Sequence, residues 1–231
     1  MPYRNSTACK DFCSAFARLR KIVKAVSRKT TLNRDITQSA YCAVISHVHS
    51  AFETYLYDVL SSWLVQLYSM RAPSTSIPKS FFAYACLNSS SDIRNFHCGI
   101  VGEKMALKQV QGNNVYKVAF NVGCDCADLK QYLAGILDKK YPSEKNLELQ
   151  FARFGLSNIY TELDKRGHSN YRLMLRSLSD KRTSIAHDYP CTSFTFADVV
   201  DALDAALKIV RTIDRVLYTH VCATSGSYCW V

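Results

Sequence analysis

An arginine and a histidine stand five positions apart in the run from Arg182 to His187. The guanidinium is a permanent planar cation that forks onto phosphate, and the imidazole exchanges protons near neutral pH. RNA cleavage without a metal needs both groups: the cation for the charge that builds on the phosphate, and the imidazole to take the 2′-hydroxyl proton or to protonate the leaving oxygen. The pair therefore predicts metal-independent RNA cleavage.

The spacing of this pair limits how one chain can use it. Five positions on a regular helix turn a side chain by roughly 140°, so Arg182 and His187 do not easily meet one phosphate. A second copy supplies the missing half, which predicts a homodimer with both motifs on a two-fold axis. A structural role stays open, because such a pair also arises by chance, with the arginine at a helix end and the histidine packed on a loop.

The residues around the pair predict a helix that ends just beyond it. The stretch that begins at Tyr171 places Leu175 and Leu178 on one apolar side. Pro190 ends the helix, because a proline pushes the preceding residue out of the helical region. The motif is thus expected at an exposed helix end.

This motif and its flanks resemble the HEPN family, a helical family in which two protomers dock and build a shared ribonuclease cleft. The run Arg182 to His187 is similar to its R-x4-H motif. Residues 46–56, 147–158 and the run from Thr195 resemble the second long helix, the short helix before the motif and the closing helix of the RiboL-PSP and MAE-type subgroup. The family most often has Asn or another polar side chain directly after the motif arginine, where this chain has Thr183.

The resemblance implies roles for the site residues. His187 is the expected general acid and base, and Arg182 is the expected clamp on the transition state. Local support is expected from Thr183, Ser184, Asp188 and Glu53. The implied products are a 2′,3′-cyclic phosphate and a 5′-hydroxyl, and the implied setting is a toxin or phage-defence effector with an antitoxin or defence-system partner. A non-catalytic RNA-binding or dimerisation module stays open as the alternative.

Positive charge is concentrated at the start of the chain. The first 36 residues hold nine Lys and Arg against two Asp, and they supply +7 of the formal net charge of +10. Neutralising phosphate dominates nucleic-acid affinity, although a solvated helix surface is the more common role of such a run. The residues predicted to bind RNA are Lys21, Lys24, Arg172, Arg176 and Lys181.

Composition predicts a globular protein rather than a disordered or membrane protein. Of 231 residues, 48% are hydrophobic and 12% are aromatic, which is enough for a sizeable core. The chain has no run of eighteen apolar residues and no signal-peptide pattern at its start. We therefore expect a cytoplasmic protein whose ten cysteines are free thiols.

Two short spacings suggest metal ligands, and neither fits a known pattern. Cys124 and Cys126 form one close cysteine pair without a second pair. His47 and His49 lack a second histidine four residues on, as a zinc-protease helix would need. We expect neither a metal nor another cofactor.

Helical periodicity at both ends of the chain predicts an all-α fold, a HEPN-like bundle of four to five long helices with a mixed, partly β insertion. Apolar spacing predicts long helices over 6–28, 37–68 and 196–221. Residues 115–122 alternate with period two and predict a strand, paired with 100–107 or with a neighbouring chain. Short helices are predicted over 81–87 and 128–139. The predicted segments are the first HEPN helices (1–69), the insertion (70–145), the HEPN helices with the motif (146–222) and a tail (223–231).

Overall fold

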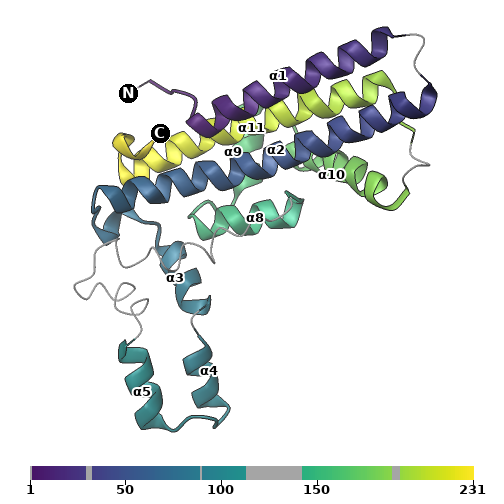
Figure 1. Ribbon diagram of the computed structural model, residues 1–231. Helices are drawn as coiled ribbons and strands as arrows, with labels where there is room; N and C mark the ends of the chain where they lie inside the picture. Colours follow the sequence, from purple (N-terminus) through teal and green to yellow (C-terminus); the bar gives the residue numbers. More distant parts are fainter. Residues whose placement is uncertain (1, 30–32, 89, 113–141, 189–192) are drawn as a thin grey trace. The chain divides into compact units, whose positions relative to one another are not determined.

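The computed structural model describes residues 2–29, 33–88, 90–112, 142–188 and 193–231, and every regular element in these ranges is helical. The elements are α1 (Thr7–Arg28), α2 (Arg34–Ser69), η1 (Ser74–Ser76), α3 (Lys79–Asn88), α4 (Ser91–His97), α5 (Glu103–Gly112), α8 (Glu144–Arg153), α9 (Ile159–Gly167), α10 (Tyr171–Asp188), α11 (Phe196–Ser225) and η3 (Ser227–Cys229) (Figure 1). Within the described ranges, no helix combines the length and apolar character that a bilayer crossing needs.

Local sequence signals explain where the long helices begin. The Ser6 hydroxyl accepts a hydrogen bond from the Cys9 N–H at 3.0 Å and caps α1. At α11, Thr195 and Asp198 cap each other, with Thr195 N to Asp198 Oδ2 at 2.9 Å and Asp198 N to Thr195 Oγ1 at 3.2 Å. These side chains satisfy amide groups that have no partner inside the helix. The predicted long helices and the all-α fold are confirmed.

The predicted insertion agrees with the structure in part. The predicted helix over 81–87 is confirmed by α3, whereas the predicted strand over 115–122 and helix over 128–139 lie outside the described residues. The strand proposed for 100–107 is wrong, because α5 begins at Glu103. Glu103 in the first turn suits the positive end of a helix dipole, and the Met, Ala, Leu and Lys that follow are strong helix formers.

The described chain forms two compact units, and each is considered by itself. The motif unit comprises Met1–Val59, Lys139–Glu148 and Asn158–Thr219, and so includes α1, α9, α10 and most of α2 and α11. In it, α11 contacts the N-cap of α1 through Asp214 and contacts α10 through Thr212. Residues two positions apart point to nearly opposite sides of a helix. The N-cap of α1 and the start of α10 therefore lie on different faces of α11.

A fully buried carboxylate ties the N-terminal segment of the motif unit to α11. Asp214 is 0% exposed and accepts hydrogen bonds from Tyr3 Oη at 2.7 Å, Ser6 N at 3.1 Å, Ser6 Oγ at 2.5 Å and Tyr55 Oη at 3.3 Å. A buried charge is tolerated where several donors surround it. Sequence reasoning missed this anchor, although Asp214 is an acid inside the otherwise apolar stripe of Val210, Ile213 and Leu217.

The second unit comprises Leu60–Asp138, Leu149–Ser157 and His220–Val231. Its core is aromatic, with the Phe154 ring centroid 5.8 Å from that of Trp63 and 5.7 Å from that of Phe81. The Trp63 indole N–H donates to Ser225 Oγ at 3.0 Å, and this hydroxyl donates to the Ser76 carbonyl at 2.5 Å. The end of α11 is thereby anchored in this unit, beyond the predicted helix end at residue 221.

Candidate active site

The structure places both motif residues on α10, as the sequence predicted. Arg182 and His187 are exposed, and His187 lies in the last turn of the helix. Within the described part of the chain, the His187 ring makes no hydrogen bond or ion pair. The two side chains leave the helix roughly 140° apart, so a single α10 presents them in different directions.

The residues expected to support the motif differ in how they are placed. Thr183 Oγ1 donates to the Ser179 carbonyl of its own helix at 3.0 Å, so this hydroxyl is used within α10. Ser184 is half-buried, and Asp188 is the last residue of α10. Within the motif unit, therefore, Thr183 supports α10 itself rather than reaching toward a ligand.

Glu53 lies on α2, one turn beyond His49, and is half-buried. His49 contacts Leu178 of α10, and the two helices run in opposite directions (Figure 1). A step from His49 to Glu53 therefore leads toward the start of α10, away from Arg182. The structure does not bring the carboxylate of Glu53 to the motif arginine of the same chain.

Three of the predicted RNA-binding residues form ion pairs at or near the surface. Arg176 binds Glu144 through two bonds, Nε to Oε1 at 2.5 Å and Nη2 to Oε2 at 3.2 Å. These bonds lower the pKa of Glu144. Arg172 pairs with Glu148 at 3.6 Å, and Lys181 pairs with Asp198 at 3.8 Å. Pairs with a single contact, such as those of Arg172 and Lys181, are weak, so phosphate can compete for these two cations, whereas the two-bond pair of Arg176 is stronger.

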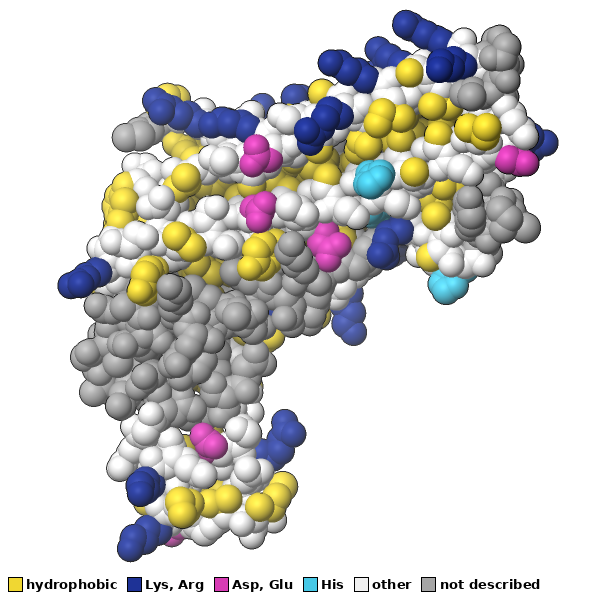
Figure 2. Space-filling model, in the orientation of Figure 1, with side chains coloured by type: hydrophobic (Ala, Val, Ile, Leu, Met, Phe, Trp, Pro, Cys, Tyr) yellow, Lys and Arg dark blue, Asp and Glu magenta, His cyan; other side chains and the backbone are white. Residues whose placement is uncertain are grey.

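The other predicted cations lie on the solvent side of α1. Lys21 and Lys24 are exposed, and helical spacing puts Lys10 and Arg28 on the same side. Basic side chains follow α1 along the edge of the motif unit (Figure 2). This basic stripe lies on α1, whereas the motif lies on α10.

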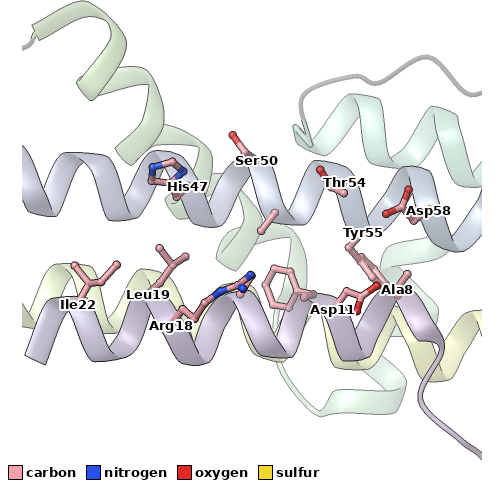
Figure 3. A pocket seen from close by; sticks show the side chains of 13 residues that line it. Ala8, Asp11, Arg18, Leu19, Ile22, His47, Ser50, Thr54, Tyr55 and Asp58 are labelled. Atoms are coloured by element: carbon pink, nitrogen blue, oxygen red, sulfur yellow. The ribbon is translucent and has the colours of Figure 1, made fainter.

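A groove of about 500 Å³ lies between α1 and α2 within the motif unit (Figure 3). Apolar and small side chains form most of its lining. Asp11 and Asp58 stand toward one end, and Arg18 and His47 toward the other (Figure 3). Neither Arg182 nor His187 lines this groove, so it is separate from the motif.

His49 faces the motif helix, and sequence reasoning did not assign it this place. Its side chain is 2% exposed, and Nε2 lies 2.7 Å from the Leu178 carbonyl oxygen. A carbonyl only accepts, so Nε2 carries the hydrogen. Burial lowers the pKa of His49 to about 4, against the opposing effect of the Leu178 bond and with a further lowering by the charge of Arg182. The available signal was its helical spacing from the buried Ile45 and Phe52.

A sequence model of the RiboL-PSP-HEPN family matches residues 14–219, which include the whole of α10. The chain belongs to this HEPN family. Searches of curated proteins and of solved structures found no match. HEPN domains often cleave or bind RNA and commonly dimerise.

The HEPN motif of this chain has the parts that phosphodiester cleavage requires. The exposed imidazole of His187 can exchange a proton with a ribose hydroxyl, and the exposed guanidinium of Arg182 can contact two phosphate oxygens. Their divergence on α10 means that these two functions serve a common phosphate most directly when they come from different copies of the HEPN domain.

Proposed function

We propose that this HEPN domain is a metal-independent endoribonuclease that cuts RNA at a composite site of a homodimer. The observation that carries the proposal is the exposure of Arg182 and His187 at one end of α10, in directions that diverge by roughly 140°. In the composite site, Arg182 of one protomer and His187 of the other face one phosphate.

The chemistry follows from the two groups. His187 takes the proton of the ribose 2′-hydroxyl, and the 2′ oxygen attacks the adjacent phosphorus. Arg182 donates two N–H groups to the phosphate oxygens as their charge increases. The bond between phosphorus and the 5′ oxygen breaks, and the imidazolium of His187 gives a proton to that oxygen. The products are a 2′,3′-cyclic phosphate and a 5′-hydroxyl.

The expected setting is a cytoplasmic toxin or phage-defence effector with an antitoxin or defence-system protein as partner. Membership of the HEPN family supports this setting. A second candidate function is an RNA-binding or dimerisation module, in which Arg182 and His187 hold phosphate without cleaving it. The alternative is favoured by Thr183, which stands where the family most often has Asn or another polar side chain and donates to its own helix.

End chemistry in the presence of excess EDTA tests the reaction. Purified protein is incubated with single-stranded RNA, and both product ends are identified. We expect cutting in EDTA with 2′,3′-cyclic phosphate ends. Binding without cutting supports the module, and cutting that stops in EDTA and resumes with Mg²⁺ contradicts the 2′-hydroxyl mechanism.

Mixing two inactive variants tests the composite site. Arg182→Ala chains keep His187, and His187→Ala chains keep Arg182. A mixed dimer then has one intact site if the two groups come from different protomers, and random pairing restores about a quarter of the wild-type sites. If the motif works within one chain, the mixture stays inactive. Each variant alone is the matched control.

A further inference from the structure

His49 contacts the one turn of α10 that leads to the motif arginine. Its Nε2–H donates to the Leu178 carbonyl at 2.7 Å, in a place shielded from water. In an α-helix, the carbonyl of residue 178 also accepts the N–H of residue 182. The imidazole of α2 therefore holds the backbone turn that begins at Leu178 and ends at Arg182.

The direction of the Arg182 side chain depends on this turn. Residues four apart share a helix face, so Arg182 lies on the same side of α10 as the buried Leu178, one turn further on. The charge of Arg182 also reaches His49, since it contributes to the low pKa of that imidazole. Arg182 thus leaves α10 on the side that faces α2, next to the group that holds its turn.

The Leu178 carbonyl does not need the hydrogen bond from His49 in order to be satisfied. A matched case exists in the second unit, where His220 Nε2 donates to the Phe154 carbonyl at 2.7 Å. Phe154 lies just past the end of α8, where carbonyls lack helical partners and need another donor. Leu178 lies inside α10, where its carbonyl already has a helical partner. The bond from His49 therefore constrains the backbone of α10 at Leu178 and does not serve to satisfy an unpaired carbonyl.

Two other contacts of this part of α10 differ from the bond of His49. Lys181 pairs with Asp198 through a single contact at 3.8 Å, with both residues in contact with solvent, and such pairs contribute little. Thr183 Oγ1 donates to the Ser179 carbonyl within α10 at 3.0 Å. The bond from His49 is buried, short and directed at the motif turn.

We propose that His49 is a positioning residue for Arg182, holding the Leu178 to Arg182 turn so that the guanidinium meets the phosphate in the geometry of the transition state. The proposal rests on the proposed nuclease function for its effect on rate. Misplacing a catalytic group by about 1 Å can cost about 10²-fold. Loss of the bond is therefore expected to lower kcat by roughly 10- to 100-fold and to change KM little, since several cations contribute to RNA binding.

The test uses three substitutions at one position in the full chain. Gln places an amide donor at the distance of His Nε2, Asn places it one atom short, and Leu removes it. We expect His49→Gln to keep kcat near the wild-type value, and His49→Asn and His49→Leu to lower it roughly 10- to 100-fold. The matched control is His220→Leu, which removes the same kind of bond in the other unit and is expected to leave kcat per folded molecule unchanged.

A cycle with Arg182→Ala separates positioning from general loosening of the fold. If His49 acts through Arg182, His49→Asn has no further effect on kcat once the arginine is gone. The proposal would be overturned if the effects of His49→Asn and Arg182→Ala on kcat multiply in the double variant. A folded His49→Gln variant with a kcat as low as that of His49→Asn would also overturn it.

A readout without RNA separates this proposal from the nuclease proposal. The Nε–H signal of Arg182, assigned by its loss in Arg182→Lys, reports side-chain order by NMR. We expect its order to fall in His49→Asn and to stay in His49→Gln and His220→Leu. Unchanged order in His49→Asn overturns the positioning role. A wild-type protein that fails to cut RNA overturns the nuclease proposal, while the NMR result still decides the positioning.

Discussion

The buried His49 and the half-buried His220 make the same hydrogen bond in the two units of this protein, with different consequences. Each donates from Nε2 to a backbone carbonyl at 2.7 Å, and burial lowers the pKa of both. His220 packs edge-on against Trp63, with ring centroids 5.8 Å apart, and completes a helix end. His49 instead holds the turn that carries Arg182. An identical bond serves packing in one unit and the direction of a functional side chain in the other.

This difference explains why burial alone is a poor guide to function. His187, the histidine with the proposed chemical role, is exposed, whereas His49 and His220, whose pKa values are lowered by burial, remain uncharged near neutral pH. The proposed role of His49 becomes apparent only because its partner, the Leu178 carbonyl, begins the turn of α10 that ends at Arg182.

The largest expected effect separates the exposed motif histidine from an exposed histidine of the second unit. His187→Ala should lower the rate of RNA cleavage about 10²–10⁴-fold, the usual contribution of a general acid or base. The rate is measured in single turnover, with melting curves to establish folding. His97→Ala is the control, since His97 is also exposed in the last turn of a helix. Wild-type cleavage by a folded His187→Ala protein would refute the assignment.

The next effect compares the buried anchors of the two units. Asp214→Ala removes an acceptor with four hydrogen bonds and leaves buried donors unpaired, which should lower the free energy of unfolding by about 3 kcal/mol. Ser225→Ala removes a hydroxyl that bridges Trp63 and Ser76 and should cost about 1–2 kcal/mol. Urea unfolding measures both. Equal losses would mean that the charge of Asp214 contributes nothing beyond its contacts.

The pH dependence of stability gives a smaller effect. His49 has a pKa of about 4 in the folded chain, below the 6.5 of a free imidazole, so the unfolded chain binds more protons between these values. Stability should therefore fall as the pH falls, by about 2 kcal/mol between pH 7 and pH 5 from His49. Urea unfolding at several pH values measures this effect. His49→Gln should reduce the loss of unfolding free energy between pH 7 and pH 5 by this amount, and His220→Gln should reduce it as well. An unchanged slope in His49→Gln would show that His49 titrates normally.

The smallest effect concerns the exposed cations of the two units. Lys21→Gln removes one charge from the basic stripe of α1, and RNA affinity should fall a few-fold. The slope of log affinity against log salt should fall by about 0.7 if this lysine contacts one phosphate of single-stranded RNA. Lys108→Gln, on the exposed surface of α5 in the second unit, is the matched control. Equal effects of the two substitutions would indicate a nonspecific charge effect.

Much of the fold could be predicted from the sequence, because helices have local causes. Apolar spacing located α1, α2 and α11, and the Thr195 and Asp198 cap located the start of α11. The wrong strand near Ile100 arose because short apolar runs suit either helix or strand. The motif helix was predicted because its apolar face and the later Pro190 are both signals within one segment.

The sequence by itself determined the all-α class, the HEPN resemblance and the motif pair, since each depends on residue types at fixed spacings along one chain. Only the tertiary structure decided that His49 meets the Leu178 carbonyl, that Asp214 anchors the N-terminal segment, and that Arg176 and Lys181 are engaged in ion pairs. Those contacts join residues far apart in the chain. They depend on which helix faces are packed together, a relation that no local spacing encodes.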